Sequence, residues 1–346
     1  MRNLFICHTQ AHLILATGLS LGRFKNDENC LILFKDFDLK HNLEHRVQRL
    51  FDNCLILKGN SSGTKSLMSR IKWHVDDNRV LRKSIVKPYD RVFAVCDWTP
   101  PVQYCLKRCL DLSDKTEFIW LEDGILAYFQ NIETRSGSER YAFTKYLRKM
   151  FFKHLCGIGS VYDRDFNGMG GLKLFKQIYC LYPEAVREPY CSKRKLVSIT
   201  NEEYFLGVSN LYDTQRLDIV SNSVILILDK LDSYLFPEKV KDVVIRLKDD
   251  LAAKEINLYC KLHPREDQMW AELNDCEFLE RSIGAESLYL SLSQMGDSIN
   301  VLGVKSAGLM SAKKMGFSVT SLFYHSGEQN DDLVQFFEKI GIRLVK

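Results

Sequence analysis

Residues 91–121, RVFAVCDWTPPVQYCLKRCLDLSDKTEFIWL, contain the pattern that decides the fold. Two apolar runs, RVFAVC (91–96) and EFIWL (117–121), flank a segment long enough for a helix. Neither run alternates apolar with polar residues, which is typical of strands covered on both faces. Such strands, joined by crossover helices, form parallel sheets. The stretch therefore predicts an α/β unit.

The same pattern recurs on both sides of this stretch. A short strand is predicted at residues 4–7, followed by a polar loop and a helix that begins near Gln10. Further runs interpreted as strands are CLILF (30–34), CLILK (54–58), SVILIL (223–228), INLYCKL (256–262), SLYLSL (287–292) and SVTSLF (318–323). The runs fall into two sets. The sequence thus predicts two doubly wound α/β domains, residues 1–190 and 191–346, with their connection between about residues 183 and 221.

Length, charge and cysteine content exclude several classes of protein. A chain of 346 residues is typical of two domains, and 48 Lys and Arg against 44 Asp and Glu leave a net charge of +4. This charge is too small for wholesale nucleic-acid binding, so no nucleic-acid partner is expected. The 11 cysteines include no CxxC pair, which is typical of reduced thiols in a cytosolic protein. No stretch has the roughly 18 apolar residues of a membrane helix.

Positive charge is concentrated between residues 135 and 195. This segment has thirteen Lys and Arg and five Asp and Glu, a balance of +8, so the rest of the chain carries about −4. Within its stretch 140–155, the sequence YAFTKYLRKMFFKHL (141–155) has a helical period, with an apolar stripe and basic residues on the other side. Such a helix suits an anionic membrane surface or the solvated face of an ordinary packed helix, and both interpretations stay open.

An acidic loop follows one strand of the first set, at the sheet edge where open α/β folds bind ligands. After EFIWL come Glu122, Asp123 and Gly124. Adjacent carboxylates suit proton abstraction and Gly permits a tight turn, so the loop is a candidate general base. An ordinary surface turn has the same composition, and that alternative stays open.

Strand ends in the second set carry groups that suit an anionic nucleotide. The candidates are His263, Pro264, Arg265, Glu286, Lys305 and Ser306. A His fixed by Pro, with an Arg beside it, suits a phosphate. Ser306 opens a helix after the strand-like SINVLG and is either a phosphate site or an ordinary N-cap. Glu286 is either a ribose contact or a solvent-exposed carboxylate.

Taken together, these motifs resemble those of bacterial sialyltransferases. Their order is an N-terminal strand with a Cys-His-Thr-Gln loop at 7–10, Glu-Asp-Gly at 122–124, His-Pro at 263–264, and then Ser306. The beginning, FICHTQAHLILA, is most similar to glycosyltransferase family 52, the lipooligosaccharide sialyltransferases, to which polysialyltransferases and O-antigen sialyltransferases are related. Each motif has only a few residues, so the specificity lies in their combination across most of the chain.

This resemblance implies a GT-B fold, with two Rossmann-like domains facing across a cleft. It implies inverting transfer of sialic acid from CMP-sialic acid to a sugar hydroxyl, without a metal or another cofactor. Glu122 is the implied general base, supported by Asp123, while His263 and Ser306 stabilise the leaving phosphate. Glu286 is the implied ribose or cytidine contact. The sequence departs from the pattern at Lys305, where many relatives have a first Ser.

The resemblance also assigns a task to each domain. The C-terminal domain is expected to bind the CMP-sugar. The N-terminal domain is expected to bind a lipooligosaccharide, O-antigen or capsule glycan, at the cytoplasmic face of the inner membrane. His8, Gln10 and Trp98 are candidates for lining the acceptor cleft, Trp98 by stacking on a sugar ring. A buried or capping Trp98 is the alternative.

Three alternatives to this function stay open. One is transfer of another CMP-activated acidic sugar such as Kdo, because no motif reads the sugar's side chain. A second is a non-catalytic nucleotide- or glycan-binding protein of the same fold. A third uses Asp36 and Asp38, an Asp-x-Asp pair that suits a metal-bound nucleotide sugar in the other large glycosyltransferase architecture. A homodimer is also left open.

Overall fold

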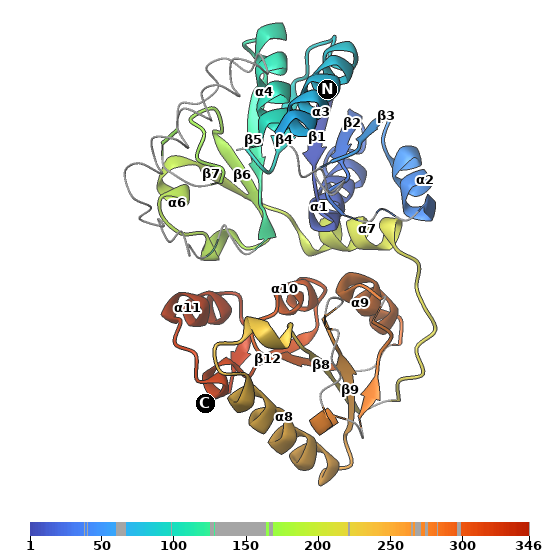
Figure 1. Cartoon of the computed structure of the whole chain (residues 1–346), viewed down its shortest axis with the longest axis vertical. Coiled ribbons are helices and arrows are strands. Elements are labelled where there is room, and N and C mark those ends of the chain that lie inside the picture. The colour runs from blue at the N-terminus through green and yellow to red at the C-terminus, as the bar shows by residue number, and fades with distance from the viewer. Residues whose placement is uncertain are drawn as a thin grey trace. The chain divides into compact units, whose positions relative to one another are not determined.

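A seven-stranded parallel sheet forms the core of the first unit in the computed structural model (Figure 1). Its strand order is β3-β2-β1-β4-β5-β6-β7. The strands are β1 (Arg2–Cys7), β2 (Glu28–Phe34), β3 (Asn53–Leu57), β4 (Arg91–Ala94), β5 (Glu117–Leu121), β6 (Gln177–Cys180) and β7 (Lys195–Ser198). The structure describes all residues except 38, 40, 60–66, 98, 125–127, 129–163, 166–168, 221, 264–265, 267–270, 274–275, 282, 296–298 and 346.

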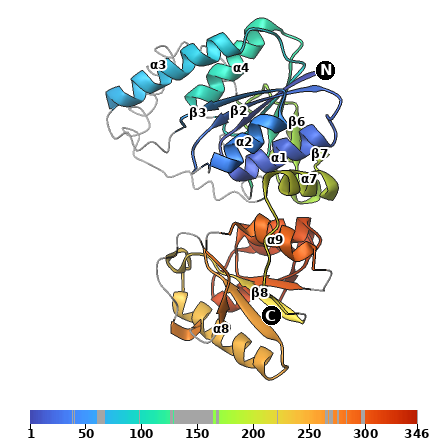
Figure 2. The same cartoon turned by 90° about the vertical axis from the view of Figure 1, so that its right-hand side faces the viewer.

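Helices cover both faces of this sheet. They are α1 (Gln10–Leu21), α2 (His41–Leu50), α3 (Leu67–Ser84), α4 (Pro100–Leu112), α6 (Tyr190–Lys193) and α7 (Asn201–Leu211), with a 3₁₀ turn η3 (Pro183–Ala185). Figure 2 shows α3 and α4 on one face and α1, α2 and α7 on the other. Because both faces are covered, residues 4–7 of β1 are all fully buried, which explains the apolar runs without alternation.

The first unit ends at Gly207, later than the boundary predicted at residue 190. Two features extend it. First, β7 adds a parallel strand to β6. Second, α7 packs against α1 so closely that a Cβ on Gly18 would lie 2.0 Å from the Glu203 carbonyl oxygen, and one on Gly207 would lie 2.1 Å from that of Ile14. Short, partly polar β6 and β7 carry a weaker apolar signal than the central strands.

The second unit, Val208–Lys346, contains a six-stranded parallel sheet of order β10-β9-β8-β11-β12-β13. Its strands are β8 (Ser223–Ile227), β9 (Asn257–Lys261), β10 (Glu277–Phe278), β11 (Asn300–Gly303), β12 (Ser318–Ser321) and β13 (Arg343–Leu344). Its helices are η4 (Leu231–Ser233), α8 (Pro237–Ala252), η5 (Ala271–Leu273), α9 (Ala285–Ser293), α10 (Ala307–Lys314), η6 (Phe323–Ser326) and α11 (Asp331–Lys339). In Figure 1, α8 covers one face of this sheet and α9 and α10 the other. Both predicted doubly wound domains are therefore present.

One predicted strand is wrong. The run SLYLSL at 287–292 belongs to α9 and is buried along its whole length. Periodicity cannot separate a buried helix from a buried strand in so short a run. Both buried serine hydroxyls are hydrogen-bonded: Ser291 donates to the carbonyl of Ser287 (3.0 Å) and accepts the backbone N–H of Gln215 (2.9 Å), and Ser287 donates to the carbonyl of Asp213 (3.4 Å).

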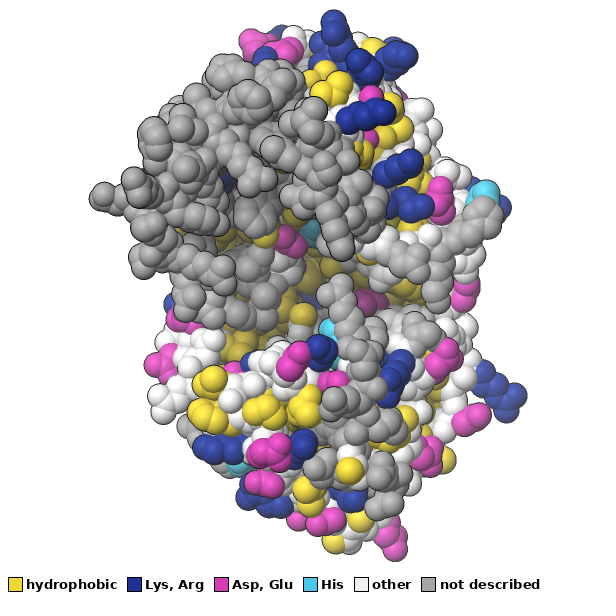
Figure 3. All heavy atoms as spheres, viewed as in Figure 1, with side chains coloured by type: hydrophobic (Ala, Val, Ile, Leu, Met, Phe, Trp, Pro, Cys, Tyr) yellow, Lys and Arg dark blue, Asp and Glu magenta, His cyan; other side chains and the backbone are white. Residues whose placement is uncertain are grey.

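The basic surface of the first unit, within the described residues, includes α3. Lys72, Arg79, Arg82 and Lys83 of this helix are exposed, and Figure 3 shows Lys and Arg side chains gathered over this part of the molecule. Over the second unit, acidic and basic side chains are interspersed (Figure 3). The predicted basic helix at 141–155 lies outside the residues that the structure describes.

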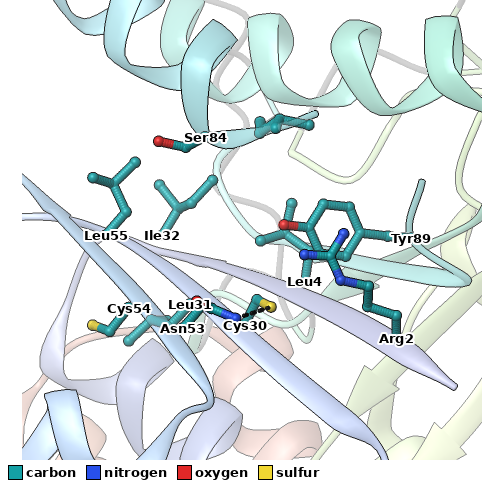
Figure 4. A pocket seen from close by; sticks show the side chains of 11 residues that line it. Arg2, Leu4, Cys30, Leu31, Ile32, Asn53, Cys54, Leu55, Ser84 and Tyr89 are labelled. Carbon is teal, nitrogen blue, oxygen red and sulfur yellow. Dashed lines mark hydrogen bonds between the residues drawn. The ribbon is translucent and has the colours of Figure 1, made fainter. Parts of the chain in front are cut away.

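A cavity of about 290 Å³ lies between the end of α3 and the amino-terminal halves of β1, β2 and β3. Figure 4 shows Leu4, Ile32 and Leu55 around it, with Arg2 and Tyr89 at one end. Parallel α/β sheets bind their ligands at the opposite, carboxyl ends of the strands. The cavity is therefore separate from the loops that carry the predicted motifs.

Candidate active site

The strand order of the first sheet reverses between the neighbouring strands β1 and β4. At such a switch point, the carboxyl ends of the strands open a crevice for ligands. His8 follows β1 and Asp97 lies shortly after β4, while Glu122 and Asp123 follow the adjacent β5. The predicted acidic loop therefore lies at the sheet edge where a site is expected.

Glu122 is buried in this loop, with 1% of its surface exposed. Its Oε2 accepts hydrogen bonds from the Tyr128 hydroxyl and from the backbone N–H of Leu181 (2.9 Å). The Tyr128 oxygen in turn accepts the backbone N–H of Tyr182 (3.1 Å). Burial, reinforced by the Glu122 charge, raises the pKa of Tyr128 well above its usual range. Glu122 thus fastens the loop to the chain that leaves β6.

Asp123 has different surroundings, with 22% of its side chain exposed. Its Oδ1 lies 2.8 Å from Nε2 of His12, in the first turn of α1. Nδ1 of His12 accepts the backbone N–H of His8 (3.2 Å), so Nε2 carries the proton that is donated to Asp123. Gly124 permits the turn with a φ of +53°. Its other oxygen, Oδ2, lies 3.9 Å from the sulfur of Cys96. A carboxylate that is oriented by such contacts and partly exposed is suited to accept a proton.

His8 forms a second His–Asp pair beside the first. Its Nδ1 lies 2.8 Å from Oδ2 of Asp36, which comes after β2, and its ring stacks on Phe34 with centroids 4.7 Å apart. The side chain is 5% exposed, and Nε2 is buried without a hydrogen-bond partner among the described residues. The pair gives Asp36 a partner other than a metal; Asp38, the other half of the Asp-x-Asp motif, falls outside the described part of the chain.

A further carboxylate at this edge, Asp97, was not predicted from the sequence. It is fully buried, and its Oδ2 lies 3.3 Å from the guanidinium of Arg164. Burial raises the pKa of Asp97, although the charge of Arg164 lowers it. Its backbone carbonyl accepts a hydrogen bond from Gln103 of α4 (2.8 Å). Asp97 therefore helps to fix the loop on the other side of the switch point.

The second sheet has its own switch point, between β8 and β11. Ser306 follows β11 and caps α10, one of the two interpretations of the sequence, because its Oγ accepts the backbone N–H of Gly308 (3.3 Å). Asp229, after β8, is hydrogen-bonded to the hydroxyls of Ser306 and Tyr234. Burial raises the pKa of Asp229, although these bonds and Lys305 lower it. Asp229 therefore lies beside the N-terminus of α10, the kind of position where anions bind.

Lys305 makes contacts within the second unit that the sequence did not indicate. Its Nζ lies 2.8 Å from both carboxylate oxygens of Glu328 and 2.8 Å from the carbonyl oxygen of Ser233. It also lies 5.2 Å from the centre of the Tyr234 ring. A phosphate would have to compete with Glu328 for this ammonium group. Its predicted contact with the donor stays a prediction.

Glu286 lies in the first turn of α9, and its Oε1 accepts the Ser311 hydroxyl (2.9 Å). This bond joins α9 to α10, the helix that Ser306 caps. The predicted ribose contact is not tested by this bond, which occupies one of the two carboxylate oxygens.

His263 lies two residues after β9, and its carbonyl accepts the backbone N–H of Glu266 (2.9 Å). Next to this loop is a buried lysine that the sequence analysis missed. Lys261 is 3% exposed, and its Nζ donates to the carbonyls of Leu262 (2.9 Å) and Arg281 (3.3 Å). Burial, reinforced by the charge of Arg281, lowers the pKa of Lys261 to about 8.

Most of the predicted residues that the structure describes follow the carboxyl ends of strands in their own unit. His8 and the acidic loop share the carboxyl edge of the first sheet, where Gln10 is the exposed first residue of α1. His263, Lys305 and Ser306 follow strands of the second sheet. Three predicted residues lie outside the described part of the chain: Trp98, Pro264 and Arg265. His12 was missed, although its spacing of four residues from His8 was a readable signal.

The described residues contain no group of three or more His, Cys, Asp or Glu placed to hold a metal ion. Within the same residues, no helix combines the length and apolar character required to span a bilayer.

Comparison with known proteins identifies relatives of the chain. The family model described as Alpha-2,8-polysialyltransferase (POLYST) matches residues 3–321. No curated protein sequence matches significantly.

Among solved structures, the chain is similar to an alpha/beta-galactoside alpha-2,3-sialyltransferase from Photobacterium phosphoreum (12% identity, 99% of this chain and 97% of that chain covered, TM-score 0.53). It is also similar to a UDP-GlcNAc 2-epimerase from Methanocaldococcus jannaschii (11%, 100% and 93%, 0.53). A third is the S. aureus MnaA-UDP co-structure (13%, 93% and 79%, 0.51). At these identities the likeness concerns the fold, which is GT-B.

Proposed function

Because the chain belongs to the alpha-2,8-polysialyltransferase family, we propose that it transfers sialic acid from CMP-sialic acid to a hydroxyl of a bacterial surface glycan, with inversion. Membership confirms the resemblance to bacterial sialyltransferases, and the chain is a glycosyltransferase. The observation that carries the proposal is the extent of the family match, because residues 3–321 include His8, the acidic loop, His263 and Ser306. A nucleotide-sugar donor is supported by two proteins of the same fold, a UDP-GlcNAc 2-epimerase and a UDP-bound MnaA.

In the proposed reaction, the acceptor oxygen bonds to the anomeric carbon while the bond from that carbon to the CMP phosphate oxygen breaks. CMP leaves with the bonding electrons, and the acceptor proton passes to a carboxylate. We assign this carboxylate to Asp123, which is partly exposed and oriented by His12. Glu122, which the family resemblance favoured, is only 1% exposed, and one of its oxygens accepts from both the Tyr128 hydroxyl and the Leu181 backbone.

The leaving phosphate is proposed to bind at the switch point of the second sheet. There the N-terminus of α10 presents backbone N–H groups to an anion, and the Ser306 hydroxyl would donate to the anion in place of Asp229. His263, after β9, is the proposed donor or general acid for the leaving group, a role carried over from the family. Since hydrogen-bond donors stabilise the charge in this scheme, the proposed reaction needs no metal ion.

The test is an assay for CMP release and glycan product. The purified chain is incubated with CMP-sialic acid and lactose, 3′-sialyllactose or oligosialic acid, and the anomeric configuration of the product is read by NMR. Transfer with inversion, retained in EDTA, is expected. The proposal fails if none of the acceptors is sialylated. A product with retained anomeric configuration would contradict the inverting mechanism, and complete loss of activity in EDTA would contradict its independence of metal.

Two control arms sharpen this assay. Replacing the donor by CMP-Kdo tests the rival donor: faster turnover with CMP-Kdo would move the proposal to that sugar. Asp111→Asn removes an exposed carboxylate whose partner is Lys107 of the same helix, so it should leave turnover unchanged.

For location, we propose the cytoplasmic face of the inner membrane, where the basic segment 135–195 contacts anionic lipid. The charge balance of +8 in that segment supports this contact. Co-sedimentation with phosphatidylglycerol vesicles is expected at low salt and should weaken as salt rises. Equal binding to neutral phosphatidylcholine vesicles would contradict the electrostatic contact.

A further inference from the structure

We propose that the His8–Asp36 pair binds a sugar hydroxyl of the acceptor through Nε2 of His8. This inference rests on the proposed function and adds a specificity-determining residue to it. The observation that carries it is the unpartnered Nε2, buried in a side chain that is only 5% exposed. A buried polar atom without a hydrogen bond costs free energy, so such atoms often mark ligand positions.

The pair fixes which hydrogen bond Nε2 can make. Nδ1 lies 2.8 Å from a carboxylate oxygen of Asp36 and therefore carries a proton. In the neutral ring, Nε2 then presents a lone pair, which accepts an O–H group. Sugar hydroxyls are the donors that an acceptor glycan offers in greatest number. The chemistry of the free nitrogen thus matches the acceptor.

Two contacts hold the His8 ring in place, and a third holds its backbone. Asp36 binds Nδ1, Phe34 stacks on the ring face, and the backbone N–H of His8 donates to Nδ1 of His12. His12 in turn donates to Asp123. His8 and the proposed base therefore share one rigid frame at the switch point of the first sheet. A hydroxyl held by His8 would be positioned relative to Asp123 by this frame.

The experiment compares two replacements that retain different halves of the imidazole. His8→Asn keeps a donor near Nδ1 for Asp36 but has no group at the position of Nε2. His8→Gln places an amide near that position. We expect His8→Asn to raise KM for the acceptor about tenfold, without a matching rise in KM for CMP-sialic acid, and His8→Gln to restore part of the loss. The matched control is His45→Asn, which changes an exposed histidine of α2.

A binding measurement separates this inference from the proposed function. Saturation-transfer NMR without donor reports contact with lactose or 3′-sialyllactose even if no transfer is detected. The glycan that binds the wild type most strongly should lose signal in His8→Asn and keep it in His45→Asn. Unchanged binding and acceptor KM in His8→Asn would overturn the proposal. A fall in kcat with unchanged acceptor KM would also overturn it, because His8 would then contribute to the chemical step rather than to acceptor binding.

Discussion

Two adjacent carboxylates with the same chemistry have unlike surroundings. Glu122 is 1% exposed and binds the Tyr128 hydroxyl and the backbone of Leu181, whereas Asp123 is partly exposed and faces His12. The sequence placed both in a loop after a strand, and the structure agrees. The family resemblance ranks Glu122 first as the base, but the residues alone could not test that ranking, because Leu181 and His12 lie 59 and 111 residues away from their partners in the chain.

At the residue scale, the two carboxylates can be told apart by isosteric amides. Asp123→Asn should lower kcat about 100-fold or more, because the amide cannot take the acceptor proton. Glu122→Gln keeps an oxygen that can accept from Leu181 and should lower kcat less than about tenfold. Steady-state kinetics with CMP-sialic acid measure both variants, and circular dichroism checks that they fold. The reverse order of effects would return the role of base to Glu122.

At the scale of elements, the crossing of α1 and α7 depends on backbone contact. A Cβ on Gly207 would lie 2.1 Å from the carbonyl oxygen of Ile14, so Gly207→Ala must push the helices apart. We expect a loss of about 3 kcal/mol in the free energy of unfolding, measured by urea denaturation. Gly284→Ala is the control, because the nearest atom to its Cβ is 4.0 Å away. Similar losses in both variants would contradict a special contact at Gly207.

Secondary-structure elements were predictable from the sequence where a long run of apolar residues marked a strand. The central strands β1, β2, β4, β5, β8 and β9 were all predicted, because burial on both faces leaves runs of apolar residues. The edge strands were harder: β10 and β13 have two residues each. The run at 287–292 became α9 because tertiary packing, rather than local pattern, decides a short buried segment.

At the scale of the whole molecule, each unit contains a buried ionisable group, and the two groups act on stability in opposite directions with pH. Burial, with the neighbouring Asp76 charge, raises the pKa of Asp77 on α3 to about 6. The pKa of Lys261 in the second unit is lowered to about 8. Asp77 favours the folded state less as pH rises from about 4 to about 6, because the unfolded chain ionises first. For Lys261, the free energy of unfolding rises with pH between about 8 and about 10.4. In this range the folded state has already released the lysine proton, whereas the unfolded chain still binds it.

Calorimetry at several pH values tests this division. Asp77→Asn should stabilise the first unit by about 2 kcal/mol at pH 7 and by little near pH 4. Lys261→Met should stabilise the second unit by a similar amount at pH 7, with the gain shrinking toward pH 10. Each substitution is expected to move the unfolding transition of its own unit. If either variant moved both transitions equally, the units would not unfold separately.

Because α1 packs against α7, α1 cannot be fully covered during synthesis until the ribosome has made α7. Arg23, just after α1, pairs with Glu203 of α7, 180 residues later in the chain. At 5–20 residues per second, a ribosome needs roughly 10 to 40 s to deliver that partner. Until then α1, nine of whose twelve residues are buried in the finished protein, lacks its cover. Ribosome-bound chains that end before residue 200 should therefore be cleaved readily in α1 by added protease, whereas chains long enough to release α7 should be protected.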